Sequence, residues 1–345
     1  MSYFSYSNNL LKSEGVEIQK IAEDRSTPFY CYSKKAITEN YNNFSNSFKN
    51  IDVKICFSLK SNSNLSILKI LSNLGAGADV VSEGELKKAL KANIEANNIV
   101  FSGVGKTEEE ISFAITNHCL QINVESLSEL NRVNTIAGNI GNKQKVALRI
   151  NPDVDPNTHG KITTGKSENK FGISVKDAFD IFKNSDEYKN IILDGIAFHI
   201  GSNINEIKPF EDSFQTTSDL LQNLSDINVP IETIDVGGGV GIENVNFSYA
   251  DYSNLISKYF DTSKKQIIIE PGRSISANTG ILVSKILYIK KTEDRKFIII
   301  DAGMNDWMRA ALYDAQHEIV PIEKKQSKDS VETIIVGPIC ETTDQ

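Results

Sequence analysis

The chain has 345 residues, of which 40% are hydrophobic and 24% are charged, and its formal net charge is -8 at pH 7. This length suffices for an α/β barrel with a smaller module, and the acidic balance argues against a general affinity for nucleic acid or anionic membranes. The amino terminus lacks a basic region followed by an apolar core, and no segment approaches the ~20 apolar residues of a membrane span. We therefore expect a cytoplasmic protein with a small-molecule ligand.

The four cysteines bear on metal and redox chemistry. They lie far apart, with no Cys-x-x-Cys pair and no histidine at ligand spacing: Cys31, Cys56, Cys119 and Cys340. Such spacing predicts neither a zinc site nor a disulfide framework. Any special cysteine must therefore act as a single thiol.

Strands and helices alternate through most of the chain. Residues 1–33 contain a short amphipathic stretch and then a strand-like segment, and 34–50 is predicted to be a helix. Eight apolar strands are predicted at 53–59, 78–82, 98–103, 120–124, 145–151, 195–200, 231–237 and 266–271. Eight alternating units predict a (β/α)8 barrel of the TIM type with a buried parallel sheet. A doubly wound sheet is the alternative, but its usual G-x-G-x-x-G turn after the first strand is missing.

After Pro271 the pattern becomes β-rich. Residues 281–303 are predicted to form two strands around a charged hairpin, and 331–338 to form another. The expected division is an N-terminal segment joining the β domain at 1–33, a barrel at 34–273, and a partial β-rich C-terminal domain at 274–345. So few strands would leave unpaired edges and uncovered apolar surface, so we expect this domain to be C-terminally truncated.

The first strand ends at Lys60, within VKICFSLKSN. A lysine at a strand end has a stiff backbone anchor while its amine points beyond the strand, as a Schiff-base lysine requires. The alternative is an ordinary surface lysine. Because catalytic groups of such barrels come from the carboxyl ends of the strands, the other strand ends must decide between these interpretations.

The triple glycine Gly237, Gly238 and Gly239 follows the seventh strand. Residues without Cβ let backbone N–H groups surround an anion, and a following helix start would add its positive end. A tight packing turn is the alternative. Phosphate sites recur after strands seven and eight of barrels, so we expect a phosphorylated ligand.

Glu270 ends the eighth strand and His199 the sixth. A lysine and a phosphate site together suggest pyridoxal phosphate, whose ring becomes an electron sink when a carboxylate keeps its nitrogen protonated. An imidazole from another strand end can stack on that ring. Taken singly, Glu270 would be a salt-bridge partner and His199 a structural residue, but with Lys60 they would form one site.

Several segments resemble, in order, the motifs of diaminopimelate decarboxylases, fold-type III pyridoxal phosphate enzymes of the alanine racemase and ornithine decarboxylase group. These segments are FSLKSN, GADVVSEGEL, HIGSN, DVGGGVGI, EPGRSISANTG, DAGMNDWMRAALYDAQH and GPICETTD. The resemblance runs from about Gly15 to Asp344. It implies the barrel and β-domain architecture, a homodimer, and decarboxylation of meso-2,6-diaminopimelate to L-lysine and carbon dioxide, the last step of lysine biosynthesis.

The resemblance also implies roles toward the cofactor. Lys60 would be the Schiff-base lysine, His199 would stack on the ring, and Glu270 would pair with the pyridine nitrogen. The residues implied in phosphate binding are Ser202, Gly237, Gly238 and Gly239, with backbone help from Gly272 and Arg273.

On the substrate side, the resemblance implies that Arg273, Arg309 and Tyr313 bind carboxylates, for which the planar arginine side chain is suited. Cys340 and Glu341 would enter the site of the neighbouring subunit, where the thiol could return a proton. The alternative for Cys340 is a buried structural cysteine. A polar loop within 151–172 could close over the site.

The sequence departs from the family pattern in places. HIGSN stands for the usual HIGSQ, so Asn203 is one methylene shorter, and family members continue for several tens of residues with a tyrosine that has no counterpart here. The alternatives are an ornithine, arginine or carboxynorspermidine decarboxylase on the same scaffold, or an inactive truncated fragment that still binds pyridoxal phosphate. Decarboxylation of diaminopimelate is favoured over these alternatives by Arg309 and Tyr313 together with Cys340-Glu341. Diamine-forming relatives have no distal carboxylate to clamp and typically carry Cys-Asp.

Overall fold

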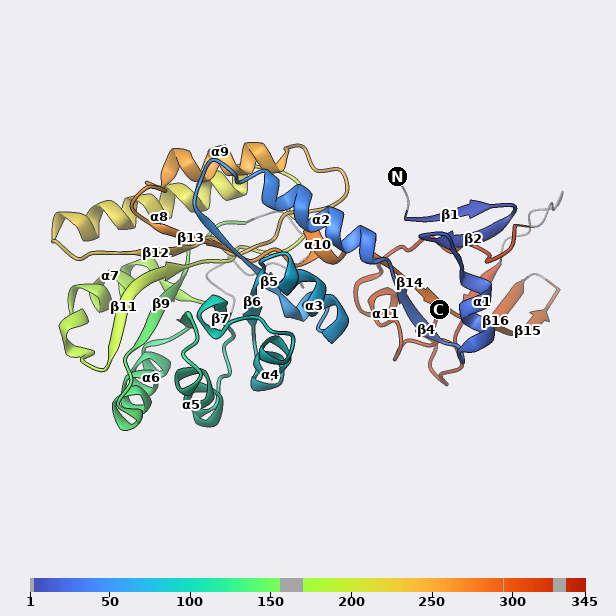
Figure 1. Cartoon of the computed structure of the whole chain (residues 1–345), viewed down its shortest axis with the longest axis horizontal. Helices are drawn as coiled ribbons and strands as arrows, with labels where there is room; N and C mark the ends of the chain where they lie inside the picture. Colours follow the sequence, from blue (N-terminus) through green and yellow to red (C-terminus); the bar gives the residue numbers. More distant parts are fainter. Residues whose placement is uncertain (1–2, 156–169, 294, 325–332) are drawn as a thin grey trace. The chain divides into compact units, whose positions relative to one another are not determined.

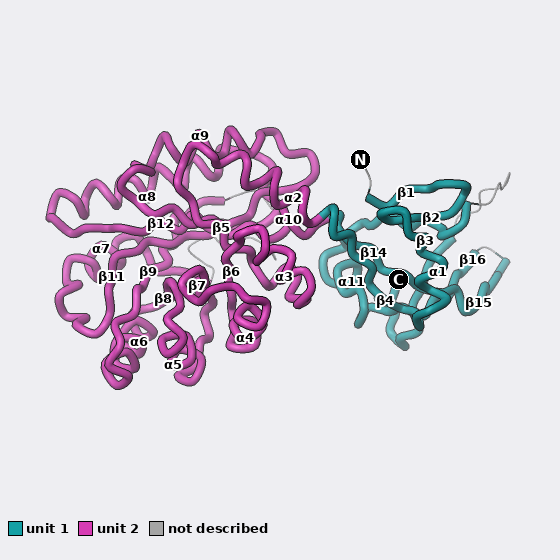
Figure 2. Tube along the Cα trace, in the orientation of Figure 1, with its two compact units in different colours: residues 1–36, 278–345 teal, residues 37–277 magenta. Residues whose placement is uncertain are grey.

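The computed structural model describes residues 3–155, 170–293, 295–324 and 333–345 (Figure 1). The chain forms two compact units (Figure 2): a barrel unit, Ile37–Ala277, and a β unit that combines Met1–Ala36 with Asn278–Gln345. Most of the loop that we expected to close over the site, and the start of the strand predicted at 331–338, lie outside the described residues. The domain limits predicted from the sequence stay a prediction.

Eight parallel strands close into a barrel, which confirms the predicted fold class (Figure 1). In chain order they are β5 (Val53–Ser58), β6 (Gly77–Val80), β7 (Ile99–Phe101), β8 (Gln121–Val124), β9 (Gln144–Asn151), β11 (Ile191–Ala197), β12 (Thr233–Asp235) and β13 (Gln266–Ile269). Each strand pairs with the next, and β13 pairs with β5 to close the ring. The short β10 (Ile173–Ser174) pairs with the end of β9. Both faces of the strands are buried, which explains their nearly continuous apolar sequences.

Helices cover the outside of the barrel (Figure 1). They are α2 (Lys34–Asn46), α3 (Leu65–Asn73), α4 (Glu83–Lys91), α5 (Glu108–Thr116), α6 (Leu127–Ile140), α7 (Val175–Lys183), α8 (Lys208–Asp226), α9 (Tyr249–Tyr259) and α10 (Arg273–Ser276), with 3-10 turns η1 (Leu59–Ser61), η2 (Ala96–Asn98) and η3 (Ser185–Glu187). Hydrogen bonds from capping side chains determine where several of these helices begin. Thr107 and Glu110, for example, form a reciprocal capping box at α5. Each such cap is worth about 1 kcal/mol and determines where a strand-end loop stops.

Aromatic side chains join α8 and α9 over β12 and β13. The ring of Tyr252, which is fully buried, lies 4.9 Å from that of Phe210 and 5.9 Å from that of Phe214, measured between centroids. Such pairs add about 0.5–1.5 kcal/mol each beyond their burial. This packing supports the two strands whose ends carry the triple glycine and Glu270.

The β unit is built from small sheets. Its elements are β1 (Phe4–Ser7), β2 (Leu10–Ser13), β3 (Val16–Glu17), α1 (Ile18–Asp24), β4 (Phe29–Tyr32), β14 (Gly280–Val283), β15 (Ile286–Lys291), β16 (Lys296–Ile300), α11 (Arg309–Tyr313) and β17 (Ile334–Val336). The first three strands pair antiparallel, and β15, β16 and β17 form another sheet in which β16 and β17 are parallel. Antiparallel pairing of β4 with β14 joins the two ends of the chain.

Strand β15 exposes apolar side chains along its length. Ile286, Leu287, Tyr288 and Ile289 keep between 43% and 72% of their surface exposed. This confirms the uncovered apolar surface that we expected for the β-rich part. Among the described residues, no helix is long and apolar enough to cross a membrane.

Candidate active site

Lys60 lies where β5 turns into η1, at the carboxyl end of the barrel. Ser61 Oγ donates to the Ser58 carbonyl at 2.7 Å, and a Cβ on Gly272 would lie 3.3 Å from the side chains of both serines. The backbone below the lysine is thus held on both sides. Its side chain is 51% exposed, and Nζ lies 3.5 Å from Oδ2 of the fully buried Asp79.

The charge of Lys60 depends on two carboxyl groups. Burial by itself lowers the pKa of the amine, but the nearby acidic groups, first Asp79 and then Glu270, outweigh it and hold that pKa above its usual range. Ser58 Oγ donates to Asp79 Oδ2 at 2.5 Å, which fixes the nearer carboxylate. The amine is therefore cationic in this state and must lose a proton before it can act as a nucleophile.

His199 follows β11, and its Nδ1 accepts a hydrogen bond from the Gly238 N–H at 3.2 Å. Burial lowers the pKa of His199 well below its usual range, and the charges of Lys60 and Arg149 lower it further. The imidazole is thus neutral near pH 7, as a ring that stacks on a cofactor can be. In the same loop Asn203 has φ 65°, a left-handed conformation that suits asparagine, which gives a backbone reason for the shorter residue in HIGSN.

The triple glycine packs tightly against neighbouring strand ends. A Cβ on Gly237, Gly238 or Gly239 would lie 2.4 Å from the Phe198 carbonyl oxygen, 2.1 Å from that of Glu270 and 2.3 Å from that of Gly201, respectively. Tight packing of the turn is therefore sufficient to explain why all three residues are glycine. No helix starts directly after it, since α9 begins only at Tyr249, so the turn lacks the positive end that a following helix start would add.

Two atoms beside this turn are available to an anion. The Gly239 N–H has no acceptor, and the partly buried Ser202 side chain has no hydrogen-bond partner, among the residues that the structure describes. Phosphate binding by this loop stays a prediction with these two observations in its support.

Glu270, directly after β13, is 8% exposed and lies in hydrogen-bonding contact with Asp235 at the end of β12. Burial raises the pKa of both carboxyl groups, and for Glu270 the neighbouring Asp235 and Asp79 charges raise it further. Two carboxyl groups in such contact share a proton, because two carboxylates would repel each other.

Sequence reasoning missed several buried polar groups around this set. Asp79 and Asp235 belong to strands β6 and β12, and Arg149 of β9 forms an ion pair with Glu125, with Nη1 and Oε1 2.6 Å apart. Asn123 of β8 donates to Asp235 Oδ2 at 3.0 Å. These residues could have been found in the sequence, because each is a charged or amide side chain within an otherwise apolar strand. Such a side chain in a barrel must find its polar partners on other strands.

Arg273 begins α10 in the barrel unit, and the four other predicted residues belong to the β unit. Arg309 and Tyr313 lie on α11, with the guanidinium 5.5 Å from the tyrosine ring centroid. Cys340 and Glu341 are exposed, so the interpretation of Cys340 as a buried structural cysteine was wrong. The structure brings together Lys60, His199, Glu270 and the glycines in the barrel unit, whereas these four residues belong to the β unit.

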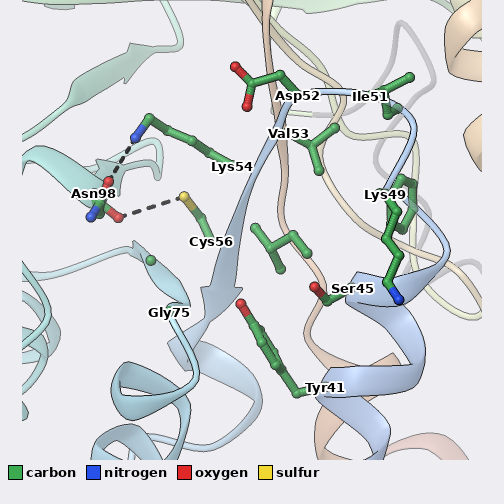
Figure 3. A pocket seen from close by; sticks show the side chains of 13 residues that line it. Tyr41, Ser45, Lys49, Ile51, Asp52, Val53, Lys54, Cys56, Gly75 and Asn98 are labelled. Atoms are coloured by element: carbon green, nitrogen blue, oxygen red, sulfur yellow. Dashed lines mark hydrogen bonds between the residues drawn. The ribbon is translucent and has the colours of Figure 1, made fainter.

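A separate pocket of about 410 Å³ lies at the amino-terminal end of β5 (Figure 3). Lys54 Nζ donates to Asn98 Oδ1 at 2.8 Å, and Cys56 Sγ lies 3.7 Å from the Asn98 carbonyl oxygen. The pocket occurs where β5 pairs with β13 alone, since pairing with β6 begins only at Cys56. It lies at the opposite end of the strand from Lys60, away from the end where barrels carry catalysis.

The strand-end residues fit pyridoxal phosphate. The amine of Lys60 would provide a covalent anchor, the Glu270 and Asp235 pair an acidic partner for a ring nitrogen, and Ser202 with Gly239 donors for a phosphate. Among the described residues no group of three or more His, Cys, Asp or Glu side chains could hold a metal ion.

Comparisons with known proteins agree with this chemistry. The family profile described as "Pyridoxal-dependent decarboxylase, pyridoxal binding domain" matches residues 34–277. A diaminopimelate decarboxylase of Haemophilus influenzae is 42% identical over 348 aligned positions, which cover 100% of this chain and 84% of that protein.

Solved structures give the same result. Diaminopimelate decarboxylase from Helicobacter pylori, complexed with L-lysine, has a TM-score of 0.88 at 39% identity and covers 94% of this chain and 82% of its own. The enzyme from M. jannaschii, also with L-lysine, has a TM-score of 0.90 at 36% identity over 99% of this chain and 82% of its own. The chain belongs to the diaminopimelate decarboxylase family of pyridoxal-dependent decarboxylases.

Proposed function

We propose that this chain decarboxylates meso-2,6-diaminopimelate to L-lysine and carbon dioxide with pyridoxal phosphate as its cofactor. The observation that carries the proposal is the convergence of Lys60, His199 and Glu270 at the ends of β5, β11 and β13, in a chain aligned over its whole length with diaminopimelate decarboxylases.

Each barrel residue has a defined task. Lys60 holds the cofactor through Nζ, His199 supports the ring face, and Glu270 accepts a hydrogen bond from the ring nitrogen. Ser202 and the Gly239 N–H, with Gly272 and Arg273, bind the phosphate. The bound cofactor supplies an electron sink for the electron pair left when the substrate loses carbon dioxide.

The remaining residues act on the substrate. Arg273, Arg309 and Tyr313 bind its carboxylates, and Glu341 contributes to the same subsite. A substrate with two amino-acid ends needs cationic groups at both its reacting and its distal end. The Cys340 thiol returns a proton to the carbon that has lost carbon dioxide.

We also propose that the enzyme is a homodimer in which Cys340 and Glu341 complete the partner's site. Their exposure supports this arrangement, since they are available to a second subunit. Mixing inactive Lys60→Ala and Cys340→Ala chains should restore about a quarter of the wild-type rate, because half of randomly formed dimers contain one intact site. A mixture that stays inactive while the two chains demonstrably exchange would contradict the shared site.

A cytoplasmic location is the remaining proposal. Its support is that all four cysteines are free thiols, which suits a reducing compartment. Fractionation of cells that express the tagged chain would test it, and recovery outside the cytoplasm would overturn it.

The substrate assignment is tested by comparing kcat/KM for meso-diaminopimelate and ornithine in purified protein loaded with pyridoxal phosphate. We expect ornithine to be poorer by about a hundredfold or more, because it leaves the distal carboxylate clamp unused. A preference for ornithine would overturn the assignment, while formation of lysine from diaminopimelate supports it.

A further inference from the structure

The contact between Asp235 and Glu270 is asymmetric. Asp235 accepts two hydrogen bonds, from the Gly237 N–H at 3.0 Å to Oδ1 and from Asn123 Nδ2 at 3.0 Å to Oδ2. Apart from its contact with Asp235, the Glu270 carboxyl group receives from the described residues a single contact of 3.5 Å, from Ser102 Oγ, at the outer limit of hydrogen-bond distance. Negative charge is therefore better stabilised on Asp235, and the shared proton resides on Glu270.

A chain of amides across the barrel interior fixes this arrangement. Gln121 Nε2 donates to Asn123 Oδ1 at 2.7 Å, so the Asn123 amide group must present its Nδ2 to Asp235 and to Ser102 Oγ, at 3.0 and 3.1 Å. Gln121, Asn123 and Asp235 are each at most 2% exposed. Water does not compete for these groups, so the orientation of the carboxylate is set by the fold.

We propose that Asp235 is a positioning residue for the cofactor: it fixes the Glu270 carboxyl group and shares with it one proton, which leaves when a protonated ring nitrogen binds. On binding, the O–H bond of the pair would break, its proton would go to solvent, and the resulting Glu270 carboxylate would accept a hydrogen bond from the ring N–H. Asp235 remains an anion behind Glu270 and adds to the attraction for the protonated ring. This inference rests on the proposed role of Glu270.

Other groups face the pair and must stay constant in any test. The titratable and charged groups are Asp79 from β6, Lys60 after β5, Cys56 from β5 and Tyr252 from α9. Asp79, Cys56 and Tyr252 remain in place when Asp235 or Asn123 is changed. Lys60 is removed in every sample of the test, so its absence is the same throughout.

The experiment measures the dissociation constant for pyridoxal phosphate as a function of pH in a Lys60→Ala background, where no Schiff base forms. Release of the shared proton makes binding tighten as pH rises. Asp235→Asn should move the midpoint of this rise down by about one pH unit, because a like charge is removed from beside Glu270, and should weaken binding at the high-pH plateau. The titrations of the free cofactor are the same in every sample, so the differences isolate the pair.

Asn123→Ala should shift the pH midpoint of cofactor binding in the opposite direction. It removes a donor from the Asp235 carboxylate, so the pair holds its proton more strongly and the midpoint should move up. If Asp235→Asn does not fold, this upward shift still tests the proposal.

Asp194→Asn is the matched control. It removes another buried carboxyl group of the barrel, on β11, whose charged neighbour Lys145 lies 3.5 Å away, and it should leave the midpoint unchanged. Unchanged midpoints in both test variants, shifts of the same sign, or an equal shift in the control would overturn the proposal. Because no substrate is present, a wrong substrate assignment leaves the outcome unaffected, whereas failure to bind pyridoxal phosphate would contradict the proposed function itself.

Discussion

The acidic groups of the barrel unit and the C-terminal site residues of the β unit lie in opposite environments. In the barrel unit, Asp79, Asp235 and Glu270 are at most 8% exposed and contact residues from several other strands. In the β unit, Cys340 and Glu341 are exposed. The barrel part of the site is organised by the packing of this chain, so we expect barrel substitutions to alter cofactor binding and stability. Substitutions in the β unit should instead alter the use of substrate.

The largest effect should come from Lys60→Ala. Loss of the amine that anchors the cofactor should remove the visible absorbance band of bound cofactor and lower kcat by about a thousandfold or more. Spectra and turnover measured on the same sample check both. Retention of the band would show that another group anchors the cofactor. It would contradict the claim that Lys60 of the barrel unit determines cofactor binding.

Arg309→Ala tests the β-unit side. Removal of a charge-assisted contact worth about 1.5–3 kcal/mol should lower kcat/KM for diaminopimelate by about tenfold to a hundredfold, while the absorbance of bound cofactor stays unchanged. Arg309→Lys, which keeps the charge but not the planar fork, should fall between. Loss of cofactor binding in either variant would erase the distinction between the units.

Glu270→Gln should stabilise the protein without cofactor at neutral pH. The raised pKa of Glu270 means that the folded state binds more protons than the unfolded state above pH ~4.3, so stability falls as pH rises toward the folded pKa. Gln removes this loss, and the free energy of unfolding in urea should increase by about 1 kcal/mol or more at pH 8. At pH 4 the two proteins should be nearly equal, and an equal difference at both pH values would show that the cause is not ionisation.

The smallest effect on stability is expected on β15. Ile289→Lys replaces a side chain that is 56% exposed, so the free energy of unfolding should change by about 0.5 kcal/mol or less. Self-association measured by light scattering should fall, because an exposed apolar strand is a template for association. Strong destabilisation would mean that this strand is covered after all.

The barrel was predictable because alternating strands and helices leave a strong local pattern, and strand ends carry Lys60, His199 and Glu270. The sequence did not predict the roles of four polar residues within the apolar strands, Asp79, Asn123, Arg149 and Asp235. Each of them matters because of its partners, which lie on strands distant in sequence. The contacts of the triple glycine with Phe198, Gly201 and Glu270, which require glycine at those positions, could not be predicted for a similar reason. Local pattern gives strand positions, but the contacts between strand ends require the closed barrel.

The most direct test of the account follows lysine formation and the cofactor band together in chain loaded with pyridoxal phosphate and supplied with meso-diaminopimelate. The account predicts continuous release of carbon dioxide with one lysine formed for each molecule released. A protein that holds the cofactor on Lys60 yet forms no lysine would contradict it.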